Sequence, residues 1–184
     1  MAKLLLEAHR RKPLKGRGVI LGRQTVFITP DQAQELVREV LGSVRPGAVI
    51  EKDIYTWRGK RDGFISDVSL FSLFTDATIE VLDYSAYQGA TILQDLCAPL
   101  PNHLKNSFDF VCNGSVLDNV FDPATAMDNI GEMLTERGIS IHVEGSHHNN
   151  YTYIKFGPSW FYDYAVVNNY HDCKAFYCIY QDMM

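Results

Sequence analysis

The stretch "IEVLDYSAYQGATILQDL", residues 79–96, holds two apolar runs that each stop at an aspartate, Asp83 and Asp95, with a glycine turn between them. Short continuous apolar runs are typical of neighbouring strands in a sheet that is covered on both faces. We therefore predict strands over 77–83 and 90–96. The ends of these strands are the first place to look for a site.

Further apolar runs along the chain predict more strands, over 19–21, 108–114, 139–145 and 173–181. Between them, segments carry helix signals: Ser, Thr or Asp as N-cap, Pro at the first helical position, Gly as the stop. Helices are predicted over 29–42, 66–74, 122–138 and 157–170. The region 43–63 mixes Pro, Gly and charges with isolated aromatics, so it is either a flexible insert or a short strand over 48–57.

Alternating strands and helices predict an α/β fold. We expect one domain over residues 1–184, with a doubly wound, mostly parallel Rossmann-like sheet and helices on both faces. In such sheets ligands bind at the carboxyl ends of the strands. The residues just after each strand are therefore the candidates for function.

Composition narrows the function classes. The net charge of −5 argues against a non-specific nucleic-acid binder, because phosphate neutralisation needs a basic face. Residues 1–17 form a basic leader, either solvated or acting as a phosphate-contacting arm. No apolar run reaches membrane-spanning length, and the four cysteines form no CxxC pair, so we expect a soluble cytoplasmic protein with reduced thiols.

Polar side chains follow the predicted strands. An acidic residue at a strand end suits a ribose, because its oxygens can accept hydrogen bonds from both vicinal hydroxyls. Asp95 could likewise accept from an exocyclic amine. Each aspartate could instead serve as a turn or cap residue that satisfies backbone donors. The candidate ligand-binding residues are Gly22, Arg23, Gln24, Asp83, Tyr84, Asp95, Leu96 and Asn113.

The order of these segments resembles the class I S-adenosylmethionine-dependent methyltransferases, most clearly from Phe71 to Tyr164. The segments "VLDYSAYQGATILQDLCAPLP", "FDFVCNGSVLDNVFDPATAMDNIGEML", "GISIHVEG" and "FGPSWFYDY" carry this resemblance. It implies S-adenosylmethionine as cofactor, with its ribose at Asp83 and its adenine near Asp95 and Leu96. It also implies that the segment 113–118 faces the substrate.

Departures from the family pattern are informative. The usual glycine-rich loop after the first strand is replaced by Gly22, Arg23 and Gln24. Arg23 could hold the methionine carboxylate as a charge-assisted pair, or it could simply fill the pocket. Asp118 and Asn119 replace the commoner Glu and His of the motif after the fourth strand, which makes them candidate catalytic residues.

The cluster "HVEGSHHNNY", residues 142–151, supplies a third catalytic candidate, His147. A neutral imidazole on a rim loop can act as general base for a hydroxyl acceptor, which we favour over a metal site. Tyr151 or Tyr153 is expected in an acceptor pocket, whereas most aromatics of the following helix are expected in the core.

Together these features predict methyl transfer from S-adenosylmethionine to an oxygen or nitrogen of a small-molecule or saccharide-type acceptor. The alternative is a methyltransferase-like binding or scaffold protein without catalysis. The family's sheet ends in an antiparallel hairpin, for which this chain has one candidate strand, over 173–181. An incomplete hairpin would leave a sheet edge that a second copy of the chain could cover.

Overall fold

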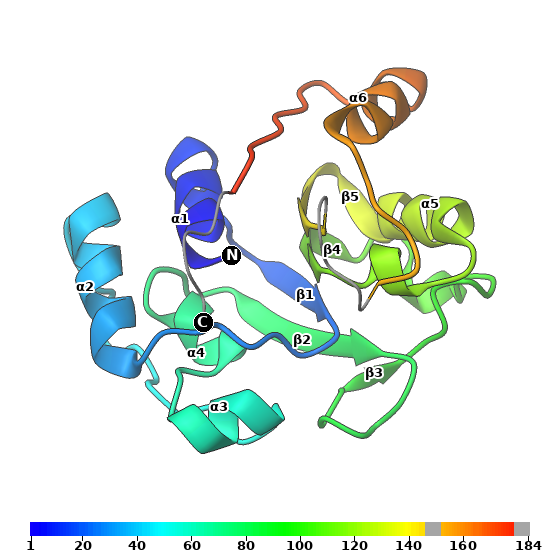
Figure 1. The fold of residues 1–184 in the computed structure, drawn as a ribbon. Coiled ribbons are helices and arrows are strands. Elements are labelled where there is room, and N and C mark those ends of the chain that lie inside the picture. Colours follow the sequence, from blue (N-terminus) through cyan, green and yellow to red (C-terminus); the bar gives the residue numbers. More distant parts are fainter. Residues whose placement is uncertain (146–151, 179–184) are drawn as a thin grey trace.

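The computed structural model describes residues 1–145 and 152–178, and its centre is a five-stranded parallel sheet (Figure 1). The strands are β1 (Arg17–Leu21), β2 (Thr78–Asp83), β3 (Ile92–Leu93), β4 (Phe108–Gly114) and β5 (Leu134–Val143). Across the sheet their order is β3-β2-β1-β4-β5, and every neighbouring pair is parallel. The predicted Rossmann-like α/β class is confirmed.

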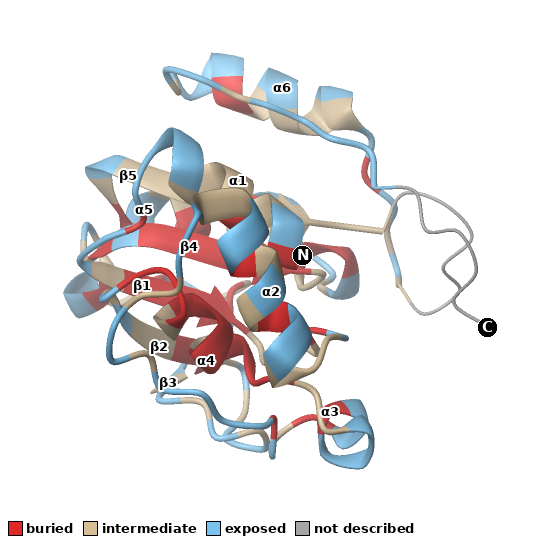
Figure 2. Ribbon diagram, turned by 90° about the vertical axis from the view of Figure 1, so that its left-hand side faces the viewer, coloured by how far each residue is buried: buried red, intermediate tan, exposed pale blue. Residues whose placement is uncertain are grey.

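Helices cover both faces of the sheet, and its central strands β1 and β4 are the most deeply buried (Figure 2). On one face lie α1 (Ala2–Arg11), α2 (Pro30–Leu41) and α4 (Asp67–Ser72), and on the other lie α5 (Pro123–Met133) and α6 (Pro158–Val167). The side chains of β1 alternate between two cores. Ile20 packs in the first core, on the side of α1, α2 and α4, and Val19 and Leu21 pack in the second core, on the side of α5 and α6. This alternation follows from the two-residue period of a strand.

Local capping signals position the helix starts as predicted. The Thr29 hydroxyl accepts from Gln32 N at 3.3 Å, the Gln32 side chain accepts from Thr29 N in return, and Gly42 ends α2 in the left-handed conformation. Ser66 caps α4 and Asp122 caps α5, each by accepting from the backbone amide three residues later.

The N-terminal segment is not a free leader. Residues 2–11 form α1, in which Leu5 and Leu6 are fully buried against the first core. The basic side chains lie on the opposite side, where Glu7 pairs with Arg10 and Arg11. The prediction of a solvated leader over 1–17 was wrong for its apolar face, because an amphipathic helix can dock while its charges stay in water.

The boundary between α5 and β5 also differs from expectation. The predicted helix over 122–138 ends at Met133, and β5 begins at once with Leu134 opposite Phe108. The register then shifts so that Ile139 lies opposite Phe110. A Cβ on Gly138 would lie 2.8 Å from a Leu134 methyl, so this glycine fits the irregular part of the strand and is not a helix stop.

Three other segments differ from their predicted structure. The segment 43–63 contains α3 (Trp57–Asp62) and a single bridge from Lys52 to Ile65 in place of a strand over 48–57. Whether it is flexible stays a prediction. The strand predicted over 90–96 is reduced to the two residues of β3. Residues 173–178 form no strand, and 179–181 lie outside the described residues, so no hairpin is present in the described part.

Short 3-10 turns, Asn102–Leu104 before β4 and Leu117–Asn119 after it, complete the described elements. None of the helices in residues 1–145 and 152–178 combines the length and apolar character needed to cross a bilayer.

Candidate functional site

A cavity of about 580 Å³ opens at the carboxyl ends of β1, β2 and β3. The chain first fills the sheet from β1 outward to β3 and then returns to β4 on the other side of β1, so β1 and β4 flank the topological switch point. The cavity walls are the residue after β1, the ends of β2 and β3, the loop 115–122, and Tyr153. Its volume suits a small-molecule ligand.

Six of the predicted site residues line this cavity together. They come from four separate segments of the chain: Gly22, Asp83, Tyr84, Asp95, Leu96 and Asn119. Gly22 has a positive φ of 63°, and a Cβ there would lie 3.5 Å from Asp83 Oδ2. The strand-end rule therefore brings the expected side chains to one place, while their roles stay predictions.

Asp83 and Asp95 each use one carboxylate oxygen to hold a turn, and the other oxygen faces no partner among the described residues. Asp83 Oδ1 accepts from Ser85 N at 2.9 Å, and Asp95 Oδ1 accepts from Cys97 N at 2.8 Å. These are side-chain turns that hold the chain at the strand end. Within the described residues the Oδ2 atom of each aspartate has no hydrogen-bond partner, so it remains available to a ligand.

An aromatic pair forms the wall opposite the strand ends. Phe121 and Tyr153 stack with ring centroids 5.0 Å apart and planes 15° from parallel, although Phe121 is 89% exposed. A large exposed ring beside a cavity offers a stacking surface for a planar ligand. Tyr153 was among the expected pocket residues, whereas Phe121 was missed, because a single Phe in a loop carries no periodic signal.

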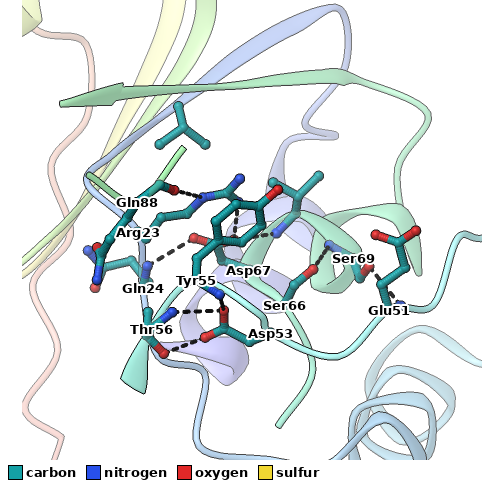
Figure 3. A network of polar contacts seen from close by, with 12 residues as sticks. Arg23, Gln24, Glu51, Asp53, Tyr55, Thr56, Ser66, Asp67, Ser69 and Gln88 are labelled. Atoms are coloured by element: carbon teal, nitrogen blue, oxygen red, sulfur yellow. Dashed lines mark hydrogen bonds and ion pairs between the residues drawn. The ribbon is translucent and has the colours of Figure 1, made fainter. Parts of the chain in front are cut away.

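Arg23 does not line the cavity and instead belongs to a polar network with Asp67, Tyr55 and Gln88 (Figure 3). Its Nη1 lies 2.7 Å from Asp67 Oδ1, and the two side chains are only 8% and 3% exposed. The guanidinium also lies 3.9 Å from the centroid of the Tyr55 ring and donates to Gln88 O. Arg23 therefore does not fill the open cavity, and its guanidinium is already paired with Asp67. That it holds a methionine carboxylate stays a prediction.

Asp67 also fixes the backbone of the loop that follows β1. Its Oδ2 accepts from Gln24 N at 2.9 Å, and its Oδ1 accepts from Val68 N at 2.8 Å (Figure 3). Asp53 organises the adjacent segment by accepting from Tyr55 N and Thr56 N. The loop that replaces the glycine motif is thus anchored by Asp67 and Tyr55. The sequence alone does not connect these residues with the loop after β1.

Gln24 occupies the crevice between β1 and β4. A Cβ added to Gly114 would lie 2.3 Å from the Gln24 Cδ and Oε1 atoms, so the amide lies directly over the end of β4. Gln24 Nε2 donates to Leu21 O at 3.3 Å and to Gly22 O at 3.5 Å. The predicted cofactor residue Gln24 therefore fills space at the switch point and does not line the open cavity.

Asn113 and Asp118 lie below the cavity in a buried polar cluster, and both side chains are fully buried. Asn113 Nδ2 lies 3.1 Å from His142 Nδ1 and donates to Glu144 Oε1. Asp118 Oδ2 accepts from Ser115 Oγ at 2.7 Å. The cluster joins the ends of β4 and β5 beneath the loop 115–122.

Burial dominates the proton equilibria of this cluster. Burial, followed by the negative charge of Asp118, raises the pKa of Glu144 to about 8. Burial alone lowers the pKa of His142 to about 4. Glu144 is thus largely protonated and His142 neutral at pH 7. Three buried atoms of the cluster region have no partner among the described residues: His142 Nε2, Glu144 Oε2 and Thr152 Oγ1.

The two remaining predicted catalytic residues are Asn119 and His147. Asn119 lines the cavity and donates to Asp118 Oδ1 at 2.8 Å. His147 lies outside the described residues, as does Tyr151. Residues 1–145 and 152–178 contain no group of three or more His, Cys, Asp or Glu side chains that could hold a metal ion.

The cavity suits one half of S-adenosylmethionine. Two strand-end carboxylates and an exposed aromatic ring match the hydrogen-bonding and stacking needs of an adenosine. The methionine half would need the space after β1 and β4, where Gln24 lies and where Arg23 is already paired. The described residues therefore fit a nucleoside and do not fit the amino-acid end of this cofactor.

Comparisons with known proteins find only distant structural similarity. Neither a protein-family model nor a curated protein matches the chain. A solved structure described as a zinc-dependent alcohol dehydrogenase from Rhodobacter sphaeroides is similar with a TM-score of 0.40 and 14% identity, over 89% of this chain and 52% of that one. The CMeT domain of the citrinin polyketide synthase is similar with a TM-score of 0.39 and 11% identity, over 65% of this chain and 35% of that one.

The chain thus spans about half of the first of these structures and about a third of the second.

Proposed function

We propose that this protein binds a nucleoside-containing ligand in the cavity at the carboxyl ends of β1, β2 and β3. The observation that carries the proposal is the cavity that Asp83 and Asp95 share. Asp83 ends β2, Asp95 follows the neighbouring parallel strand β3, and each keeps one carboxylate oxygen free among the described residues. The ligand's ribose would donate its hydroxyls to Asp83, and its base would lie toward Asp95 and Phe121.

Methyl transfer from S-adenosylmethionine to an oxygen or nitrogen of a small-molecule or saccharide-type acceptor is the second candidate. Apart from the resemblance, its support is Glu144, which faces Asp118 of the loop 115–122, because a carboxyl with a pKa of about 8 can exchange a proton at neutral pH. Against it stands Gln24, which favours a methyltransferase-like protein that binds nucleosides without catalysis.

The proposal predicts that Asp83→Asn weakens adenosine binding about tenfold or more, because a charged hydrogen-bond acceptor for the ribose is lost. Asparagine keeps an oxygen for the turn with Ser85 N, so the fold is retained. The measurement is isothermal titration of adenosine. The matched control is Asp76→Asn, since Asp76 is exposed and lies outside the cavity. A wild type that does not bind adenosine, or an unchanged affinity in Asp83→Asn, would contradict the proposal.

A second prediction concerns the aromatic wall. Phe121→Ala should reduce adenosine affinity by about fivefold or more, because stacking of a base on an aromatic ring contributes roughly 1–3 kcal/mol. Phe176→Ala is the control, since Phe176 is also exposed but does not line the cavity. Equal affinities for the two variants would argue against stacking at Phe121.

A further inference from the structure

The Gln24 side chain packs over the end of β4, beside the switch point between β1 and β4. In a doubly wound sheet the crevice at this point is where a ligand enters between the strand ends. Gly114 leaves it open on the β4 side because it has no side chain, but the Gln24 amide occupies the space where a Gly114 Cβ would lie. Among the described residues, the Gln24 amide is held there by two long hydrogen bonds to backbone carbonyls, at 3.3 and 3.5 Å.

The backbone that carries Gln24 is fixed far more firmly than its side chain. Gln24 N donates to Asp67 Oδ2, and Asp67 is at the same time the partner of the buried Arg23 guanidinium. The loop therefore cannot shift without breaking a buried ion pair, which is costly. A smaller side chain at position 24 would therefore free space over the end of β4 without a movement of the loop.

The order of the strands gives a direction to the bound ligand. Asp95 follows β3, Asp83 ends β2, and Gly22 follows β1, and these strands are consecutive neighbours in the sheet. A nucleoside with its base near Asp95 and its ribose at Asp83 therefore directs its 5′ carbon toward β1 and β4. Any long substituent on that carbon would meet Gln24.

We infer that Gln24 sets the length of the ligand: the site accepts nucleosides with a small or absent 5′ substituent and excludes those with an amino-acid-sized one. This inference rests on the proposed nucleoside site and names the class of ligand within it. It concerns shape, so a side chain of equal volume should have the same effect as glutamine, and a residue without a side chain should not.

The test is a titration of adenosine and of S-adenosylhomocysteine into the wild type, Gln24→Gly and Gln24→Met. We expect the wild type and Gln24→Met to prefer adenosine by about tenfold or more, and Gln24→Gly to bind both within about threefold. Adenosine affinity should be similar in all three proteins. Gln24→Ala serves in place of Gln24→Gly if a thermal melt shows that the glycine variant does not fold.

The outcomes separate the inference from the proposal on which it rests. If the wild type binds adenosine but the preference over S-adenosylhomocysteine is absent, or persists unchanged in Gln24→Gly and Gln24→Ala, the inference is wrong and the nucleoside site stands. If adenosine does not bind to the wild type, both are wrong.

Discussion

Replacing Asp67 with alanine is expected to lower the free energy of unfolding by about 3–5 kcal/mol, because it leaves the Arg23 guanidinium buried without its counter-charge. The Asp67 carboxylate lies 2.7 Å from Arg23 Nη1 and also accepts from Gln24 N and Val68 N. Two backbone amides therefore lose their partner together with the charge. The measurement is urea unfolding at equilibrium.

Asp62→Ala is the matched control. Asp62 pairs with Arg61 at 2.6 Å, but the Arg61 side chain is 56% exposed, and exposed pairs contribute little. We expect a much smaller change for this control than for Asp67→Ala. The double variant Arg23→Met with Asp67→Leu should recover much of the loss, since apolar residues of similar volume can replace a buried pair. An Asp67→Ala variant as stable as Asp62→Ala would show that Arg23 finds solvent or another partner.

Much of the fold is predictable from local signals. The N-caps Thr29, Ser66 and Asp122 and the stop at Gly42 act within one helical turn, so residue type and spacing suffice to predict them. Elements whose form depends on distant pairing are not predictable in this way. β5 starts at Leu134 because that residue pairs with Phe108, and a glycine that resembles a helix stop is used in an irregular strand.

The candidate site likewise has residues that local signals predict and residues whose roles depend on distant contacts. The strand-end rule predicts Gly22, Asp83 and Asp95 because parallel topology brings all carboxyl ends to one edge. The partner of Arg23 is a residue 44 positions away in the sequence, so the sequence leaves both of its roles open. The burial of Glu144 likewise depends on packing among β4, β5 and the loop 115–122, which no short motif encodes.

The buried carboxyl of Glu144 should make stability fall as the pH rises toward 8. Its pKa is raised from an ordinary 4.5 to about 8, so between these values the folded protein holds a proton that the unfolded chain has lost. His142, with its pKa lowered from 6.5 to about 4, has the opposite effect, which fades as the pH rises past 6.5. Glu144 therefore dominates between pH 6.5 and 8, and comparison with a Glu144 variant cancels the remaining contribution of His142.

We expect the free energy of unfolding of the wild type to fall by roughly 1.5 kcal/mol relative to Glu144→Gln across this window, since each pKa unit corresponds to about 1.4 kcal/mol. Glutamine stays neutral at every pH and can still accept from Asn113 Nδ2, so it mimics the protonated acid. The measurement is urea unfolding at pH 6.5, 7.2 and 8.0, with Glu39→Gln as an exposed control that should follow the wild type.

Asp118 faces Glu144, and its negative charge contributes to the raised pKa of Glu144. Asp118→Asn should therefore weaken the pH dependence without abolishing it, because burial is the larger cause of the raised pKa. Parallel profiles for the wild type and Glu144→Gln would mean that Glu144 is already ionised at neutral pH, and the carboxyl cluster would then lose its support as an acid–base group.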